Sequence, residues 1–195
     1  QGLAIMLLKF DQGIHFNTAC IEAIKEKNPV AAGEELGAKL TYGFKNIRRS
    51  LSLILSDSLT QESSQLITGL QEKLGRGFPL VGASISDNLL PHKSYLYHNA
   101  ELSNNACAGL LFGGAINFGF GIKHGWKPLG KPHQVTETEV NLIKSIDHLP
   151  AIQLYQDYLN FEPGQLKKEL KLISALYPLG IRLEGEKEYL IRSIV

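Results

Sequence analysis

The stretch SLSLILSDSLTQESSQLITGLQEKLGRGFPLVGASI, residues 50–85, decides the fold because it encodes a strand, a helix and a second strand in succession. Residues 50–55 alternate serine with leucine and isoleucine, the period-two pattern of a strand with one buried face. We expect a helix to run from a cap at Thr60 to Gly75. Its apolar face comprises Leu66, Ile67, Leu70 and Leu74. Residues 78–85 then resume as an apolar strand, which predicts a βαβ-like unit with short links.

Two further elements are expected before this unit. Residues 3–10 form a continuous apolar run of strand length, which is typical of a strand buried on both faces. A helix should follow this strand, capped by Asn17 or Thr18, with Cys20 and Ile24 one turn apart on one face. The pattern therefore predicts a strand and then a helix at the start of the chain.

A second helix is predicted to begin at Pro29, because Asn28 and Pro29 stop the preceding one. Its apolar stripe comprises Ala31, Ala32, Leu36 and Leu40. Gly33 and Gly37 each cost this helix about 1 kcal/mol relative to alanine, so their presence indicates close packing against a neighbouring element.

The hydrophobic pattern changes from Lys93 onward, where strand-like segments follow one another without a helical pattern between them. These segments are residues 95–97, 107–113, 115–122 and 140–146. Helices are predicted to begin at Pro150 and Pro163, and a hairpin spans residues 179–194. The expected fold class is α+β, with mainly antiparallel, mixed sheet layers covered by helices. An αββα-type sandwich is one such arrangement.

Composition excludes several classes of function for this chain of 195 residues. The formal net charge is +1, and basic residues are scattered except at residues 45–49 and 167–171, so no nucleic-acid or membrane-surface partner is expected. Two distant cysteines indicate neither a disulfide framework nor a zinc ribbon. The cytoplasm is the expected compartment. Because Gln1 is not an initiator methionine and strand-like runs lie at both ends, we expect a piece of a longer protein.

Residues 113–136 are the most irregular stretch of the chain and contain its only tryptophan. Glycine permits close approach and positive φ, while proline restricts φ, so this loop has a defined shape. The spacing of Gly119, Gly121 and Gly125 resembles a dinucleotide loop, but no helix follows to hold a pyrophosphate. No cofactor is therefore expected. His124 and His133 have no clustered carboxylate or thiol, so no metal site is predicted.

Recognition of a neutral or zwitterionic small molecule is the function that these residue types allow best. Trp126 offers a flat apolar face, His124 a donor and an acceptor, and Asp87 a carboxylate for an amine. The candidate ligand-binding residues are Asp87, His124, Gly125, Trp126, Thr136 and Asn141. Sequence alone leaves open whether Trp126 contacts a ligand or closes the open end of a sheet.

Residues 124–136, HGWKPLGKPHQVT, resemble the FIST family, named for F-box and intracellular signal transduction proteins. FPLVGASISD at residues 78–87 is similar to the family's P-V-x-G-G-x-A-x-D segment, although Ala83 replaces the second glycine. Leu149-Pro150-Ala151, followed by Tyr155, Tyr158 and Leu159, resembles a further segment, and Tyr177-Pro-Leu-Gly180 with Tyr189-Leu-Ile-Arg192 resembles the start of the C-terminal FIST domain. The resemblance implies an N-terminal FIST domain over residues 1–160, without its first strand, and the start of the C-terminal one over residues 161–195.

The resemblance also implies an intracellular sensory module that binds an amino acid or a similar metabolite, without catalytic residues of its own. Its partner would be a signalling output domain, fused or separate. Two alternatives stay open. One is a hydrolase that uses Cys20, Cys107 or Ser84 as its nucleophile. The other is a protein-interaction scaffold, as in F-box proteins that recruit substrates.

Overall fold

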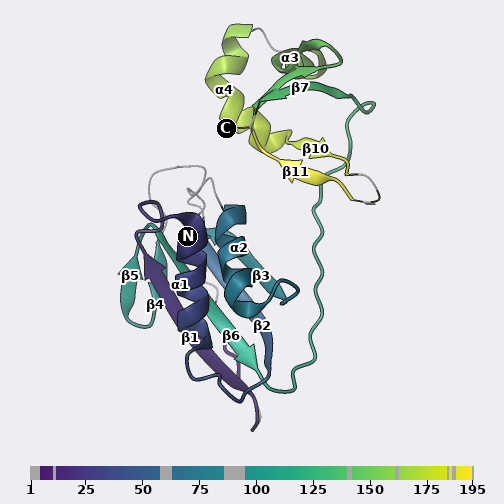
Figure 1. Ribbon diagram of the computed structural model, residues 1–195. Coiled ribbons are helices and arrows are strands. Elements are labelled where there is room, and N and C mark those ends of the chain that lie inside the picture. Colours follow the sequence, from purple (N-terminus) through teal and green to yellow (C-terminus); the bar gives the residue numbers. More distant parts are fainter. Residues whose placement is uncertain are drawn as a thin grey trace. The chain divides into compact units, whose positions relative to one another are not determined.

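The computed structural model describes residues 5–10, 12–57, 63–85, 95–139, 142–160, 163–183, 185 and 188–194. It comprises two compact units, Gln1–Phe120 and Gly121–Val195, which we describe separately (Figure 1). Both units combine helices with sheets that are mainly antiparallel, so the predicted α+β class is confirmed. The αββα arrangement and the boundary at residue 160 stay predictions.

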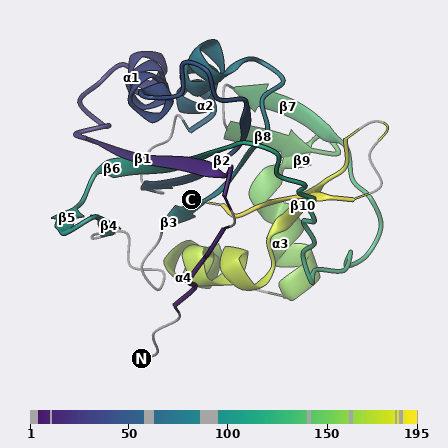
Figure 2. The same cartoon turned by 90° about the horizontal axis from the view of Figure 1, so that it is seen from below.

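The first unit is built on a four-stranded sheet in the order β1-β6-β2-β3. Its strands are β1 His15–Glu22, β6 Ala106–Gly113, β2 Arg49–Asp57 and β3 Leu80–Ile85. Strand β6 pairs antiparallel with both β1 and β2, whereas β2 and β3 are parallel. Helices α1 (Pro29–Thr41) and α2 (Ser63–Leu74) lie side by side over one face of this sheet (Figures 1 and 2). A short hairpin of β4 (Leu96–His98) and β5 (Glu101–Ser103) completes the unit.

The strand, helix and strand predicted from residues 50–85 are confirmed as β2, α2 and β3. Burial in β2 does alternate with a period of two, but the buried side chains are Ser52, Ile54 and Ser56. Leu51 and Leu53 are half-buried and Leu55 is exposed, so the leucines do not form the buried face. The predicted helical face is mostly right, since Leu66, Leu70 and Leu74 are buried while Ile67 is exposed. The cap predicted at Thr60 lies outside the described residues.

The helix predicted after Asn17 is wrong, because this segment is strand β1. The strand pairs with β6 along its whole length, from His15 opposite Gly113 to Glu22 opposite Ala106. Asn17 does cap a helix, but it caps the C-terminal end of α1 and not the N-terminal end of a helix that follows it. Its side-chain amide donates to the carbonyl oxygens of Lys39 and Leu40, both at 3.0 Å, where α1 ends.

The strand predicted over residues 3–10 is wrong for the part that the structure describes. Residues 5–10 form no regular structure, and their apolar side chains are exposed. The strand expected over residues 115–122 is likewise absent, since these described residues have no regular structure. Residues 107–113 do lie within a strand, β6. In both cases an apolar run predicts a strand, but the described residues include no strand that pairs with it.

Helix α1 begins at Pro29 as predicted, and the side chain of Asn28 accepts a hydrogen bond from the Ala31 amide at 3.1 Å. The close packing predicted from Gly33 is confirmed. A Cβ atom at Gly33 would overlap the backbone oxygen of Leu66 in α2, and one at Gly69 would overlap the backbone oxygen of Val30 in α1. The two helix backbones therefore touch where each has a glycine.

The second unit contains a three-stranded antiparallel sheet of β7 (Val135–Glu139), β8 (Leu142–Ile146) and β9 (Leu149–Pro150). Helices α3 (Ala151–Leu159) and α4 (Pro163–Leu176) and a hairpin of β10 (Leu179–Ile181) and β11 (Leu190–Arg192) follow, as predicted from the two prolines and the C-terminal pattern. Tyr155 and Ile173 form its buried core. Among the described residues, no helix has an apolar stretch long enough to span a bilayer.

Replacement of Gly33 by alanine tests the contact between the helices. Alanine is the better helix former by about 1 kcal/mol, but the added methyl group overlaps a backbone oxygen that moves only if the helices separate. Overpacking of this kind costs about 1–3 kcal/mol or more. We expect Gly33→Ala to lower the free energy of unfolding, measured by urea denaturation with circular dichroism.

Gly77→Ala is the matched control in the same unit, because a Cβ atom there has no neighbour within 4 Å. It should leave the free energy of unfolding unchanged or raise it by up to about 1 kcal/mol. Equal or greater stability of Gly33→Ala would contradict the close contact of α1 with α2.

Candidate functional site

The loop of residues 121–134 leads into β7 and lacks regular structure. Near its start, the Nε2 atom of His124 lies 3.0 Å from the backbone oxygen of Tyr189. Because a carbonyl oxygen only accepts, Nε2 carries the proton and donates it, and in the neutral ring Nδ1 is then an acceptor. This Nδ1 atom is buried and has no hydrogen-bond partner among the described residues. An unpaired buried polar group of this kind typically costs about 1–3 kcal/mol.

Trp126 and Gly125, which follow His124 directly, are exposed. The side chain of Trp126 retains 44% of its accessible surface, and Leu129 in the same loop is more exposed still. A Cβ atom at Gly125 would have no neighbour within 4 Å, so the space beside this residue is open. The loop therefore presents an indole ring to solvent two residues after the histidine that has an unsatisfied nitrogen.

His133 anchors the other end of the loop through both of its ring nitrogens. Its Nδ1 lies 2.7 Å from Oδ2 of Asp147, and its Nε2 lies 2.9 Å from the hydroxyl of Tyr158. Because the carboxylate accepts, Nδ1 donates to Asp147, and the neutral ring then accepts from Tyr158 at Nε2. The three side chains form a directed chain of hydrogen bonds from tyrosine through histidine to aspartate.

Asp147 is placed by the turn between β8 and β9. Asp147 and His148 have φ values of 50° and 65°, so both central residues of this two-residue turn are left-handed, as a type I′ hairpin requires. The Gln134 amide donates to Oδ1 of Asp147 at 2.8 Å. This hydrogen bond, followed by the one from His133, lowers the pKa of the Asp147 carboxyl below its usual value.

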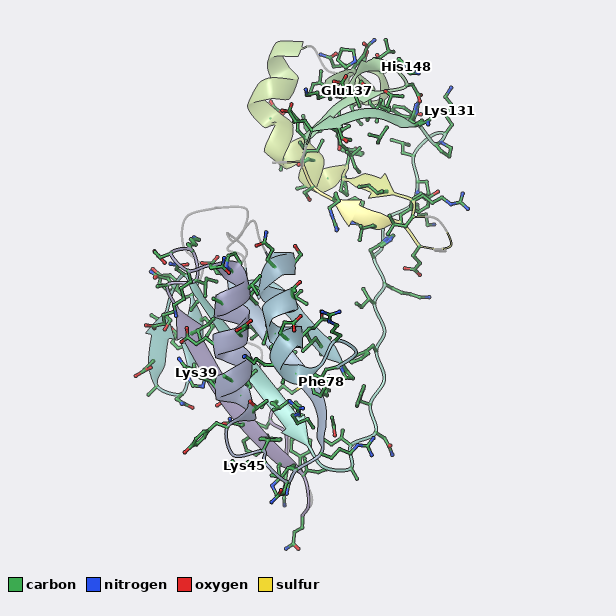
Figure 3. All side chains as sticks on the ribbon, in the orientation of Figure 1. Lys39, Lys45, Phe78, Lys131, Glu137 and His148 are labelled. Atoms are coloured by element: carbon green, nitrogen blue, oxygen red, sulfur yellow. The ribbon has the colours of Figure 1, made fainter. Side chains whose placement is uncertain are left out.

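Thr136 lies in β7 and contacts the same turn. Its hydroxyl oxygen accepts from the His148 amide at 3.0 Å and lies 2.9 Å from the Ser145 hydroxyl. Figure 3 shows His148 at the end of the unit where this turn lies, near Glu137 of β7. Thr136 is therefore already engaged by the turn of Asp147 and His148.

The structure thus brings Thr136 close to the His133 cluster and puts His124 beside Tyr189, while Gly125 and Trp126 are exposed in the loop. Asp87 and Asn141 lie outside the described residues. The sequence patterns do not predict Asp147, Tyr158 and Ser145 as members of this region. The available signal was the pair Asp147-His148 between a strand pattern and Pro150, since Asp and His tolerate the left-handed turn conformation.

The chemistry of the cysteines and of Ser84 bears on the hydrolase alternative. Cys107 is fully buried in β6, and burial raises the pKa of its thiol to about 12. Burial also raises the pKa of Cys20, which lies in strand β1 and not in the helix expected for it. Ser84 is exposed in β3. Among the described residues, no three His, Cys, Asp or Glu side chains are grouped as a metal site requires.

Comparison with known proteins gives one family and one distant relative. Residues 1–149 match the family model described as the FIST N domain. An uncharacterized protein of Methanocaldococcus jannaschii is 21% identical over 167 residues, which cover 80% of this chain and 31% of that protein. The chain therefore spans less than a third of this relative's length. No solved structure matches the chain.

Replacement of Asp147 by asparagine tests the hydrogen-bonded turn. Asparagine tolerates the left-handed backbone but carries no charge. The pKa of Asp147 is lower in the folded chain than its usual value of 3.8. The charged carboxylate therefore stabilises the fold fully above pH 3.8, and this stabilisation is lost as the pH falls through the lower pKa of the folded chain. We expect Asp147→Asn to be less stable than the native chain at neutral pH, with a difference that shrinks below pH 3.8. Urea unfolding followed by Trp126 fluorescence measures it.

Glu137→Gln is the control, because it removes a carboxylate of the same unit whose described ion pair, with Lys144, is 3.8 Å long and exposed. Its unfolding should show the same pH dependence as that of the native chain. A constant difference between Asp147→Asn and the native chain at all pH values would contradict a role for the Asp147 charge.

Alkylation tests the state of Cys107. A rise of its pKa from 9.0 to about 12 leaves about a thousandfold less thiolate at neutral pH. In a Cys20→Ser variant, iodoacetamide should label Cys107 at least a thousandfold more slowly in the folded protein than in guanidinium, as measured by mass spectrometry. Rapid labelling of the folded protein would instead favour the hydrolase alternative.

Proposed function

Because this chain belongs to the FIST family, a family of signal-transduction proteins, we propose that it is a sensory domain that binds a small ligand, an amino acid or a similar metabolite. The ligand would occupy the loop of residues 121–134. The observation that carries this proposal is the buried Nδ1 atom of His124, which has no hydrogen-bond partner among the described residues. A ligand that donates a hydrogen bond there would remove the cost of an unpaired buried acceptor.

The neighbouring residues favour a ligand with both a polar donor and an apolar part. The ammonium group of an amino acid is a donor that suits the Nδ1 atom of His124. The exposed ring of Trp126 provides an apolar face for the rest of the ligand, and the space beside Gly125 is open. In this proposal Thr136 supports the adjoining turn through its hydrogen bond with the His148 amide.

The two histidines favour binding because they hold the loop at both ends. His124 is tied to the backbone at Tyr189, and His133 is tied to Asp147 and Tyr158. Gly130, at φ 76°, lies so close to Tyr158 that a Cβ atom would overlap the tyrosine ring. A loop held in this way loses less conformational entropy when a ligand binds than a free loop does.

The output of such a sensor would come from a partner or from a further domain. The chain covers 31% of its archaeal relative, so the activity of the whole protein is a proposal as well. We propose that ligand binding in the cytoplasm is passed to a signalling partner, fused or separate. A protein partner that binds Trp126 directly, as in an interaction scaffold, is the alternative that the test below distinguishes.

A panel of free amino acids against the full chain tests the proposed function. A ligand at a hundred times its dissociation constant should stabilise the folded chain by about 2.7 kcal/mol, which thermal unfolding detects. Because Trp126 is the only tryptophan, its fluorescence reports on this loop alone. We expect at least one amino acid both to raise the melting temperature and to shift the emission of Trp126 to shorter wavelength.

His124→Ala should abolish both the rise in melting temperature and the shift in emission. Trp126→Ala should lower the apparent affinity derived from the thermal shift by about tenfold, which corresponds to about 1.4 kcal/mol. Leu129→Ala is the matched control, because it removes another exposed apolar side chain from the same loop. Absence of stabilisation by every amino acid would refute amino-acid sensing. A protein captured from solution by the native chain but not by Trp126→Ala would then support the scaffold.

A further inference from the structure

The basic cluster at residues 45–49 lines an open pocket of the first unit. The pocket has a volume of about 510 Å³ and lies where α1 and α2 both end. Its lining residues are Thr41, Phe44, Lys45, Ile47, Arg48, Arg49, Leu74 and Phe78. Figure 3 shows Lys45 and Phe78 at this end of the unit. The volume falls in the range of about 300–1,000 Å³ that is typical of small-molecule sites.

The inner wall of this pocket is apolar and belongs to the core. Phe44 and Leu74 are buried, and Ile47 and Phe78 pack against the same cluster of side chains. Gly113, at the end of β6, permits this arrangement, because a Cβ atom there would come within 2.6 Å of Cε1 of Phe44. Phe44 is therefore held in place by its contact with β6 as well as by the segment that follows α1.

Among the described residues, the lining of the pocket carries three cations and no acidic side chain. Arg49 donates from Nη1 to the Lys73 carbonyl at 3.1 Å, which fixes its guanidinium at the end of α2. Lys45 and Arg48 form no ion pair with any residue that the structure describes, whereas Lys27, Lys39 and Lys73 all pair with glutamates of α1. The positive charge at the pocket thus stays uncompensated by this part of the chain.

Compensation of the helix dipoles does not account for these cations. The C-terminal ends of α1 and α2 carry partial negative charge, which basic residues in the last turn offset. Lys39 and Lys73 already occupy those last turns, and Arg49 caps a carbonyl of α2. Lys45 and Arg48 lie beyond the helices and beside an apolar wall, so they remain available to an anion.

We propose that this pocket binds a small organic anion, with the charged group at Lys45 and Arg48 and an apolar or aromatic part against Phe44, Ile47 and Phe78. A carboxylate and a phosphate ester share this chemistry, since guanidinium and ammonium groups bind both. All the lining residues belong to the first unit, whereas Trp126 belongs to the second. The pocket would give the domain a second ligand site.

Binding of phenyl phosphate and of phenylacetate to the full chain tests this inference and distinguishes the two kinds of anion. Isothermal titration calorimetry should detect at least one of them. Inorganic phosphate and benzyl alcohol, which each supply one half of the ligand, should bind at least about tenfold more weakly. Failure of both aromatic anions to bind would overturn the proposal, as would equal binding of benzyl alcohol.

The variant Lys45→Gln/Arg48→Gln should lose at least about tenfold in affinity for the better aromatic anion. Arg76→Gln is the matched control: it removes a positive charge beyond the end of α2, from a side chain that is 88% exposed and pairs with Glu72. Its affinity should stay within about twofold of native. A comparable loss in both variants would show that binding depends only on overall charge and would overturn the site.

Two further measurements separate this pocket from unfolding and from the proposed amino-acid site. Circular dichroism and thermal unfolding should show that the double variant keeps its fold, because both replaced side chains are exposed. Phe78→Leu should weaken the aromatic anions but not inorganic phosphate. Trp126→Ala should leave phenyl phosphate binding unchanged, so loss of binding in that variant would overturn the assignment to this pocket.

Discussion

The contact of α1 with α2 at Gly33 and Gly69 is the constraint on which the first unit depends. At this contact each glycine lies against the backbone oxygen of a residue in the other helix. Helices that approach so closely can both lie on one face of a narrow sheet, where their leucines meet Ile54 and Leu111. The same approach sets the positions of the two helix ends, and hence of the pocket that Phe44 and Leu74 line.

Local patterns in the sequence predicted those elements whose partners lie nearby in the chain. The unit of β2, α2 and β3 was predicted because a period of two gives way to a helical period within residues 50–85. Strand β1 was missed because Asn17 and Thr18 are common helix caps, and only pairing with residues more than 80 positions away makes this segment a strand. Local residue propensities therefore predict poorly a strand that forms only by pairing with a distant segment of the chain.

The candidate site shows the same division between local and distant information. The irregular loop at residues 113–136 could be identified from its glycines, prolines and tryptophan alone. The bonds that hold the loop could not, because Asp147 and Tyr158 reach His133 across 14 and 25 positions. A histidine and an aspartate separated in this way carry no recognisable spacing, so their pairing becomes evident only in the folded chain.

The two loop histidines differ in a way that assigns them different tasks. Both nitrogens of His133 are satisfied, by Asp147 and Tyr158, so this ring has no remaining hydrogen-bonding capacity and serves as an anchor. His124 uses only Nε2, at the Tyr189 carbonyl, which fixes its tautomer and leaves Nδ1 as an acceptor. The hydrogen bond at Nε2 orients the ring, and Nδ1 has no partner among the described residues. For this reason we propose His124, and not His133, as the residue of the loop that contacts a ligand.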